Sequence, residues 1–472
     1  MIALTYSISL AADSSVYMAN GIKIGEVDSD SAIIWTRLTK YPERKLTGYQ
    51  FKNIGKISNK QKSDVKFDGM NQMPEGLTLG DMEDSVLGAT GEVRVIYWPE
   101  SSQKAKKETK WTAVETDNDF TYHFKLSGLE AWTRYQLSVE GRASAGDPTT
   151  IALKGSFTTA PIPNQEANIT LTVVTCGDHA RRDDLEKGHM IYKTIKDQIK
   201  PHFLVHTGDI EYYDRPAPWA PSVSLARYKM NRLYAMPFTR DLHKVTASYF
   251  QKDDHDITKN DGAPGTNFGA LTWEKGLKVY YEQFPVGDKP YRTIRWGKDL
   301  QIWLVEIREY RSQNTEPDGP EKTLYGKAQK QWLIDTINKS DASYKLLISP
   351  TPIVGPDREA KKDNHSNQAF KHEGDEIRRF VASHDNLFII NGDRHWQYYS
   401  VDEETGAREF SCGPHSNTHA GGFKQKFKTS EHKFLRVDGG FLSVNVSRQN
   451  NSPRITFRHH NVYGDVMNEE IF

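Results

Sequence analysis

The sequence has only two cysteines, Cys176 and Cys412, among its 472 residues. This number excludes a disulfide-rich scaffold. It does not show in which cellular compartment the protein works, because the two thiols can form one disulfide, bind a metal or stay buried and free. No hydrophobic run approaches the length needed to span a bilayer, so no transmembrane segment is expected. The 62 basic and 62 acidic residues give no net charge. We therefore expect no positive electrostatic field of the kind that attracts nucleic acid.

Apolar residues are nevertheless plentiful. Hydrophobic residues make up 37% of the chain and aromatic residues 11%, which is enough for a folded core. The length predicts two or three domains, one of them a large α/β unit. Near the N-terminus, Ile2–Ala12 is apolar but follows no basic residue. We interpret it as a first β-strand, with an export signal as the alternative.

Residues 1–160 have a pattern of strands without convincing helices. Gly91–Trp98 alternates between apolar and other residues with period two. Between Leu126 and Tyr135, a leucine, a turn and a tyrosine entering the next strand form the arrangement of a tyrosine corner. We predict an all-β sandwich of the fibronectin or immunoglobulin-like kind, with an insertion or long hairpin near residues 40–88. Such a domain can bind carbohydrate or protein, or serve as a spacer or a wall beside an active site.

Short strands alternate with helical stretches over residues 168–472, which predicts an α/β catalytic domain. The expected strands include Ile169–Val174, Phe203–His206 and Leu387–Asn391, and one helix is expected over Leu225–Leu242. Two packed sheets flanked by helices would account for this pattern. Ligands of such folds lie at the carboxyl ends of strands, so polar residues just beyond these strands are candidate site residues.

Four polar clusters occupy such positions. They are Cys176, Asp209 with Tyr212, the segment Asp253–Asp261, and Asp393 with His395. Each has an ordinary alternative when taken alone, namely a buried thiol, a turn or a solvated loop. Carboxylates suit hard metal ions, whereas a thiolate selects a softer ion such as iron or zinc. Asp393 and His395 lie two residues apart, so an extended segment would point both to one side.

In this order the clusters resemble the alkaline phosphatase D (PhoD-type) family of calcineurin-like metallophosphatases, over the whole chain. Further matches are Glu306–Arg311, Leu324–Leu333, Phe410–Asn417 and His419–Gly422. Two features depart from the family pattern: Glu306 stands where an aspartate is usual, and the loop after the Asp209 motif has no counterpart. The resemblance implies an α/β fold in which an N-terminal β-sandwich precedes a two-sheet αββα phosphoesterase domain.

The resemblance also implies two different metal ions. Fe³⁺ would be bound by Cys176, Asp209, Tyr212 and His395. Ca²⁺, or another divalent ion, would be bound by Asp209, Asn260 and Asp393. An amide oxygen such as that of Asn260 suits a hard ion such as calcium. Three further residues, His206, Asp254 and Arg394, are expected to contact the substrate or to support the ligands.

Two such ions can hold a hydroxide and clamp a phosphate ester for in-line attack. We therefore expect a metal-dependent phosphoesterase that hydrolyses phosphomonoesters, phosphodiesters or both. His255 would protonate the leaving oxygen, and Arg308 would face the transferring group. The alternatives are that His255 orients Asp254 and that Arg308 forms a structural ion pair.

Two other functions remain open at this stage. One is a hydrolase of the same fold that acts on another polar ester. The other is a carbohydrate-binding surface protein with a degenerate hydrolase domain. All four polar clusters are intact, which argues against a degenerate domain. We expect an extracytoplasmic protein, periplasmic or secreted, whose signal is absent or trimmed. The oligomeric state is left open.

Overall fold

The computed structural model describes residues 15–472. Within this range the chain forms three β-sheets and several helices around a common core. The segment Ile2–Ala12, which was expected to form a first strand, lies outside the described residues.

The largest sheet has nine strands and a parallel centre. There β9 (Ile169–Val174), β10 (Phe203–His206) and β11 (Ala247–Phe250) lie side by side in that order. The structure confirms the two strands expected at Ile169–Val174 and Phe203–His206. The remaining strands extend the sheet on both sides: β1 (Ile22–Gly25), β2 (Ser31–Arg37), β6 (Thr121–Ser127), β19 (Gly440–Gln449), β20 (Ser452–Asn461) and β21 (Val466–Ile471).

The second sheet has seven strands. β15 (Leu387–Asn391), the strand expected from the sequence, pairs in parallel with β14 on one side and with β17 on the other. The other strands are β12 (Arg292–Trp296), β13 (Leu300–Leu304), β14 (Tyr344–Ser349), β16 (Gln397–Val401), β17 (Arg408–Cys412) and β18 (His432–Arg436).

Apolar side chains on alternate residues hold these two sheets together. Val205 of β10 and Ile348 of β14 share the core between the sheets. Their neighbours Leu204 and Leu347 face outward, toward helices. This period of two is what a strand with both faces buried requires. The resulting layers are helix, sheet, sheet, helix.

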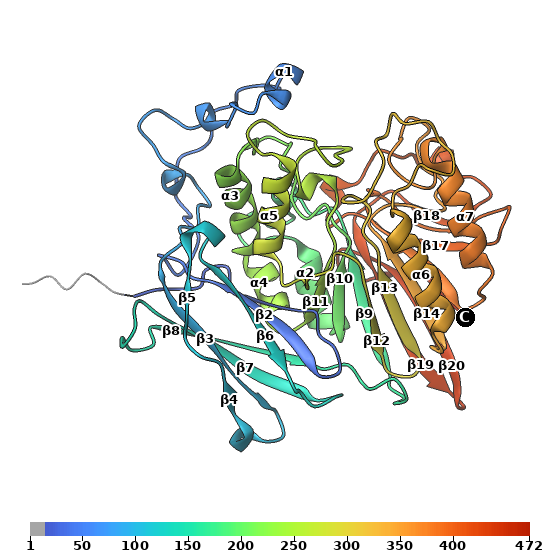
Figure 1. The fold of residues 1–472 in the computed structure, drawn as a ribbon, viewed down its shortest axis with the longest axis horizontal. Coiled ribbons are helices and arrows are strands. Elements are labelled where there is room, and N and C mark those ends of the chain that lie inside the picture. Colours follow the sequence, from blue (N-terminus) through green and yellow to red (C-terminus); the bar gives the residue numbers. More distant parts are fainter. Residues whose placement is uncertain (1–14) are drawn as a thin grey trace, which may run out of the picture.

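The helices cover the outer faces of the two large sheets. Figure 1 shows α3, α4 and α5 beside the nine-stranded sheet, and α6 and α7 beside the seven-stranded sheet. Their bounds are α2 (Met190–Thr194), α3 (Val223–Tyr234), α4 (Pro237–His243), α5 (Trp273–Gln283), α6 (Lys327–Lys339) and α7 (Lys371–Ala382).

The prediction of one helix over Leu225–Leu242 is wrong. The chain forms α3 and α4 instead, with Met236 in an extended conformation between them. Pro237 explains the break, because proline has no backbone N–H to donate and is favoured at the first position of a new helix.

The third sheet consists of N-terminal strands. It contains β3 (Gly91–Pro99), β4 (Lys107–Glu108), β5 (Thr112–Val114), β7 (Arg134–Arg142) and β8 (Ile151–Thr158). The Tyr135 hydroxyl accepts a hydrogen bond from the backbone N–H of Glu130 at 2.9 Å, as a tyrosine corner requires.

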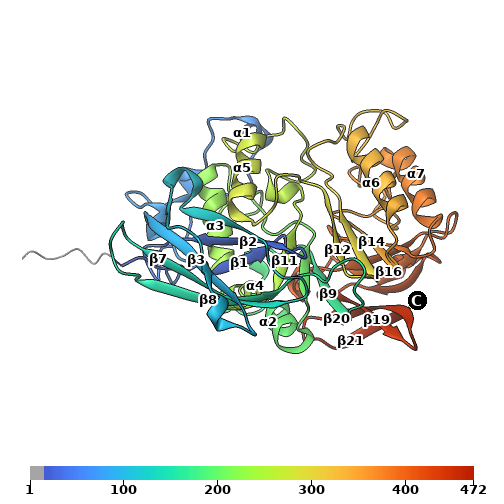
Figure 2. The same cartoon turned by 60° about the horizontal axis from the view of Figure 1, so that its bottom comes forward.

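The first 160 residues also contribute to the nine-stranded sheet. β1 pairs in parallel with β11, close to which it is labelled in Figure 2. β2 lies between β1 and β6 in the sheet. Strand pairing therefore crosses the boundary expected between residues 160 and 168. The division into two domains at that point stays a prediction.

The insertion at residues 40–88 consists of short helical turns, including α1 (Asn59–Ser63). The Gln72 side chain forms two hydrogen bonds with the backbone of Trp219, and the Tyr228 hydroxyl in α3 donates to the carbonyl of Glu83. The insertion thus packs against α3 and against the loop that precedes it.

Candidate metal centre

Loops beyond four parallel strands bring polar side chains to one place between the sheets. Cys176 follows β9, Asp209 follows β10, Asp253 follows β11 and Asp393 follows β15. Three of them, Cys176, Asp209 and Asp393, have left-handed φ angles of 55°, 53° and 58°. Residues with side chains seldom adopt this conformation, and such strain persists mainly where the surrounding structure imposes it.

The four residues expected to bind iron lie together. Oδ2 of Asp209 accepts a hydrogen bond from the Tyr212 hydroxyl at 2.9 Å and lies 3.6 Å from Sγ of Cys176. The Tyr212 oxygen is also 3.1 Å from Nε2 of His395. Cys176 and Cys412 are both free thiols, which excludes the disulfide that the sequence left open.

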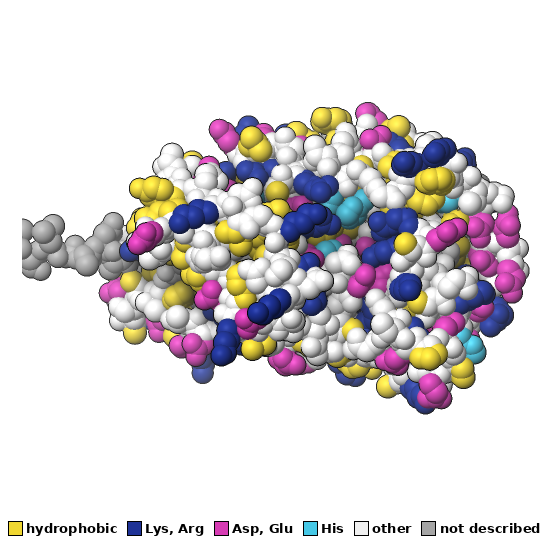
Figure 3. All heavy atoms as spheres, turned by 90° about the horizontal axis from the view of Figure 1, so that it is seen from above, with side chains coloured by type: hydrophobic (Ala, Val, Ile, Leu, Met, Phe, Trp, Pro, Cys, Tyr) yellow, Lys and Arg dark blue, Asp and Glu magenta, His cyan; other side chains and the backbone are white. Residues whose placement is uncertain are grey.

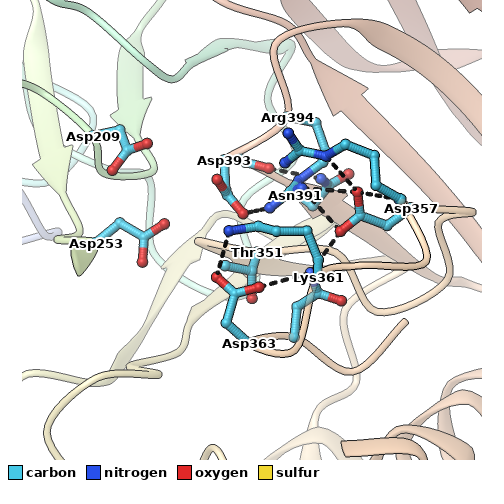
Figure 4. A network of polar contacts seen from close by, with 12 residues as sticks. Asp209, Asp253, Thr351, Asp357, Lys361, Asp363, Asn391, Asp393 and Arg394 are labelled. Atoms are coloured by element: carbon cyan, nitrogen blue, oxygen red, sulfur yellow. Dashed lines mark hydrogen bonds and ion pairs between the residues drawn. The ribbon is translucent and has the colours of Figure 1, made fainter. Parts of the chain in front are cut away.

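A second group of carboxylates shares Asp209 with the first. One oxygen each from Asp209, Asp253 and Asp393 lies within 4.8 Å of the others. Asp209 and Asp253 come from the nine-stranded sheet and face Asp393 across the gap between the sheets (Figure 4). Oδ1 of Asp209 and Oδ2 of Asp253 are buried and have no hydrogen-bond partner among the described residues. Buried carboxylate oxygens without a donor are costly, so this donor set fits a cation.

Asn260 does not lie in this group. It is exposed, and its backbone N–H, not its side chain, is bound to Asp214 at 2.9 Å. Asp253 occupies the position beside Asp209 and Asp393 that was expected for Asn260. A helical turn, Asp254–Asp256, separates the buried Asp253 from the exposed Asn260.

Burial disfavours the ionised form of four candidate ligands, Asp209, Cys176, Tyr212 and His395. It raises the pKa of Asp209 well above its ordinary range, and His255 only partly offsets this effect. Burial also raises the pKa of Cys176 and of Tyr212, and the Asp209 carboxylate raises both further. Burial lowers the pKa of His395. Ionised thiolate, phenolate and carboxylate groups at this spacing need a cation among them.

His255 is bound to a carboxylate that the sequence analysis did not single out. Its Nδ1 lies 2.5 Å from Oδ1 of Asp214. Burial lowers the pKa of His255, but Asp214, Asp254 and Asp209 outweigh burial and raise the pKa to about 10. The His255 ring lies beside that of Tyr212, with 4.3 Å between centroids and the ring planes tilted by 40°. This placement allows the ring to carry a proton at the edge of the metal centre.

The two arginines lie behind the ligands. Arg308 is fully buried, and its Nε donates to Oδ1 of Asp253. Arg394 is also fully buried and donates to both oxygens of Asp357, at 2.8 and 2.9 Å. Both geometries match the structural roles that the sequence left open for these side chains.

The other expected residues also lie close by. His206 is buried in β10; its Nδ1 accepts from the N–H of Gly208, and its ring lies 5.1 Å from that of His415. His206 is therefore held between the Gly208 turn and His415, and its role at the centre stays a prediction. One oxygen of Asp254 lies within 4.8 Å of ligand atoms of Asp209 and His255.

Comparison with known proteins agrees with this architecture. A model of the family described as PhoD-like phosphatase matches residues 171–465. The chain belongs to this family. The family resemblance seen in the sequence is thereby confirmed, and the expected class, a phosphoric ester hydrolase, agrees with it.

Individual PhoD-like relatives are distant in sequence. Alkaline phosphatase D of Bacillus subtilis (strain 168) is 23% identical over 203 residues, which are 34% of this chain and 33% of that protein. The match thus spans about a third of the curated relative.

Two solved structures share the fold. A structure described as that of PhoD has a TM-score of 0.71 at 16% identity and covers 98% of this chain and 90% of its own. Purple acid phosphatase PPD1 from yellow lupin (Lupinus luteus) seeds has a TM-score of 0.64 at 10% identity, covering 97% and 74%. At these identities the structures show a common mixed α/β fold and no more.

The structure adds residues that sequence reasoning missed. The ring of His419 lies 4.2 Å from that of His395, and its Nδ1 lies 3.1 Å from the carbonyl of Cys176. The only indication of His419 in the sequence was its place in the segment His419–Gly422, which was noted as a match to the family. Lys361 pairs with Asp261 and Asp363 near Asp393 (Figure 4), in a loop without a recognisable motif.

One face of the molecule is hollowed near its middle. Figure 3 shows histidine side chains inside this hollow, with basic and acidic side chains around it.

Proposed function

We propose that this protein is a metal-dependent phosphoesterase. The observation that carries the proposal is the position of Asp209, whose carboxylate belongs both to the group with Cys176 and His395 and to the group with Asp253 and Asp393. One carboxylate shared by two ligand groups is what a centre of two neighbouring metal ions needs. Family membership supports the same reaction class.

The donor sets suggest that the two ions differ. A thiolate and a phenolate favour Fe³⁺ in the group of Cys176, Tyr212, Asp209 and His395. Three carboxylates favour a hard divalent ion, Ca²⁺ in our proposal, in the group of Asp209, Asp253 and Asp393. Ions of this kind polarise a phosphate ester and make a water molecule acidic enough to attack it.

The chain's own residues would complete the reaction. His255, held by Asp214, is placed to donate a proton to the leaving oxygen of the ester. Arg308 orients Asp253 through its buried ion pair, and Arg394 forms ion pairs with Asp357 and with the proposed ligand Asp393. Asp254 and His206 support the ligands from the side and from behind.

The finer assignments from the sequence stay part of this proposal. They are a β-sandwich over residues 1–160, a catalytic two-sheet αββα domain over residues 168–472 and a location outside the cytoplasm. Among the described residues, no helix is long and apolar enough to cross a membrane.

Turnover of bis(p-nitrophenyl) phosphate and p-nitrophenyl phosphate by protein loaded with iron and calcium tests the proposal. We expect turnover of at least one ester, and its loss in Asp209→Asn. Loaded protein that hydrolyses carboxylic esters but neither phosphate ester would favour the other polar-ester hydrolase. If the protein binds neither metal and hydrolyses no ester, the result would favour the alternative of a carbohydrate-binding protein with a degenerate hydrolase domain.

A further inference from the structure

A cavity of about 770 Å³ lies apart from the metal ligands. Three parts of the chain form its wall: the insertion at residues 40–88, the loop 179–187 that follows Cys176, and helices α3 and α4. None of the six proposed metal ligands, all within the described range, lines it. Its volume is within the roughly 300–1,000 Å³ range of small-molecule sites.

Three arginines surround a buried histidine in this cavity. They are Arg44 from the insertion, Arg182 from the loop and Arg232 from α3, and the histidine is His179. Nη1 of Arg182 lies 3.1 Å from Nδ1 of His179, which assigns the ring proton to Nε2. Burial lowers the pKa of His179 well below its ordinary value, and Arg232, Arg182 and Arg44 lower it further. The ring is therefore neutral and has three arginines around it, with the Asp84 carboxylate 3.5 Å from Nε2.

The nearby carboxylates do not balance these cations. Asp84 lies 2.7 Å from Arg44 and 4.0 Å from Arg182. Glu211 lies 3.3 Å from the buried Lys229 and 3.7 Å from Arg232. Two carboxylates thus serve four cations. At the rim, Glu43 pairs with Arg240, Glu83 is half-buried like Asp84, and Glu186 is exposed, so solvent screens it.

Arg232 has donors without acceptors. Its side chain is only 6% exposed, and its Nη1 donates to the carbonyl of Ala217 at 2.8 Å. Its Nε and Nη2 are buried without a hydrogen-bond partner among residues 15–472. Nε2 of His179 also forms no hydrogen bond, and the nearest carboxylate oxygen, Oδ2 of Asp84, lies 3.5 Å from it. Unsatisfied buried donors of a charged group are costly, so an acceptor that enters the cavity would be strongly favoured.

We propose that this cavity binds a phosphate group through Arg232, Arg182 and His179, as a second anion site beside the metal centre. The planar fork of Arg232 matches two phosphate oxygens. Nε and Nη1 of Arg182 donate to the carbonyls of Leu185 and His179, so its Nη2 is the donor left for the phosphate, and the two guanidinium charges offset a dianion. The group could belong to free inorganic phosphate or to a larger phosphorylated molecule, since the recognising chemistry is the same.

The site also gives the insertion a function. Arg44 and Asp84 of the insertion form one wall, and the loop on the other side leads directly back to Cys176. The Ala217 carbonyl bound by Arg232 lies on the segment that follows Tyr212. An occupied cavity would hold both segments in place behind the metal centre.

Calorimetric titration of the metal-loaded full chain with inorganic phosphate tests the inference. We expect two phosphates per chain, one at the metals and one in the cavity. In Arg232→Gln the second affinity should fall about tenfold or more, the loss expected for charge-assisted hydrogen bonds. Arg182→Gln should weaken it in the same direction, and its more exposed side chain lowers the risk of misfolding. KM for p-nitrophenyl phosphate should not change in either variant.

Arg94→Gln is the matched control, because Arg94 pairs with Glu108 and Glu140 on the third sheet. A single phosphate per chain in the wild type, or two in both cavity variants with unchanged affinity, would overturn the inference. If the loaded protein hydrolyses no phosphate ester but Arg232→Gln still removes a bound phosphate, the proposed function fails and the cavity site stands.

Competition with phenylphosphonate separates the two sources of the phosphate group. Displacement of phosphate from both sites shows that the cavity accepts the phosphate end of a larger molecule. Displacement from the metal site alone shows that the cavity takes free phosphate. Both results require a second phosphate and support the inference.

Discussion

Tyr212 donates its phenolic hydrogen to Oδ2 of Asp209, three residues earlier on the same loop, at 2.9 Å. Both side chains are buried, and burial raises the pKa of each. The proton between them occupies the position that a cation would take, since an ion bound by both oxygens replaces the O–H contact. The pair is thus arranged for a metal ion that can displace a phenolic proton.

Tyr212→Phe should abolish a visible absorption band. If Tyr212 binds Fe³⁺, the phenolate gives a charge-transfer band that phenylalanine cannot give. Iron affinity should fall by at least 10–100-fold, the loss that removal of a supporting residue alone causes. Absorption spectra with elemental analysis check both expectations. Tyr213→Phe, a buried neighbour in an apolar cluster, should keep the band. An iron-loaded wild type without colour would refute the role of Tyr212.

Asp253→Asn should lower the content of the divalent ion while iron remains bound. Asp253 contributes an unpartnered buried oxygen next to Asp209 and Asp393. Asn260→Ala should leave both metals in place, because Asn260 is exposed. Elemental analysis after dialysis against limiting metal distinguishes the two. The opposite result, with the loss confined to Asn260→Ala, would restore the ligand expected from the sequence.

His255→Gln should affect esters with poor leaving groups most. A general acid contributes about 10²–10⁴-fold, and the contribution is largest where the leaving oxygen is basic. We expect kcat/KM to fall more for phenyl phosphate than for p-nitrophenyl phosphate. Asp214→Asn should give the same pattern more weakly, because Asp214 only holds the ring. An equal loss for both esters would assign His255 to orienting a ligand.

Metal removal should destabilise the protein more as the pH rises. Burial raises the folded-state pKa of Asp209 and of Asp253 above the ordinary value. In the metal-free protein the stability from these protonated groups is therefore present below about pH 4 and is lost as the pH rises through the raised values. Bound metal ions would stabilise the ionised carboxylates, so the loaded protein would not lose this stability as the pH rises. The gap in Tm between loaded and chelated protein should widen from pH 5 to pH 8, and a constant gap would contradict the assignment.

Much of the centre could be predicted because it follows strand ends. Apolar runs such as Phe203–Val205 and Leu387–Ile390 define buried strands, and the first polar residues after them must lie at the edge of the sheet. This rule places Cys176, Asp209 and Asp393 correctly without any knowledge of distances. The tyrosine corner at Tyr135 is similarly local, which is why it too was predictable.

Features that depend on the direction of a loop were not predictable. Asp253 and Asn260 are both polar and belong to one segment, and only the turn at Asp254–Asp256 decides which faces inward. β1 and β2 looked like part of a separate sandwich, because sequence patterns identify a strand but not its partner. The buried contact of Arg394 with Asp357 joins two loops, and no spacing rule predicts it.

The Arg394–Asp357 pair gives a test of stability that does not depend on metal chemistry. Both side chains are fully buried, and Nη1 of Arg394 donates to both oxygens of Asp357. Asp357→Asn keeps the shape but leaves the Arg394 charge short of a partner, which should lower the free energy of unfolding by about 3–5 kcal/mol.

Asp288→Asn is the control for this prediction, because Asp288 pairs with Lys125 where both side chains are well exposed. Exposed pairs contribute about 0–1 kcal/mol, so this variant should unfold like the wild type. Denaturant unfolding monitored by tryptophan fluorescence measures both variants. A loss below about 1 kcal/mol in Asp357→Asn would mean that another group compensates Arg394, and the neighbouring Asp393 is the first candidate because it also forms an ion pair with Arg394. Asp393 would then serve the arginine at the expense of the metal ion, and divalent metal affinity should fall in the same variant.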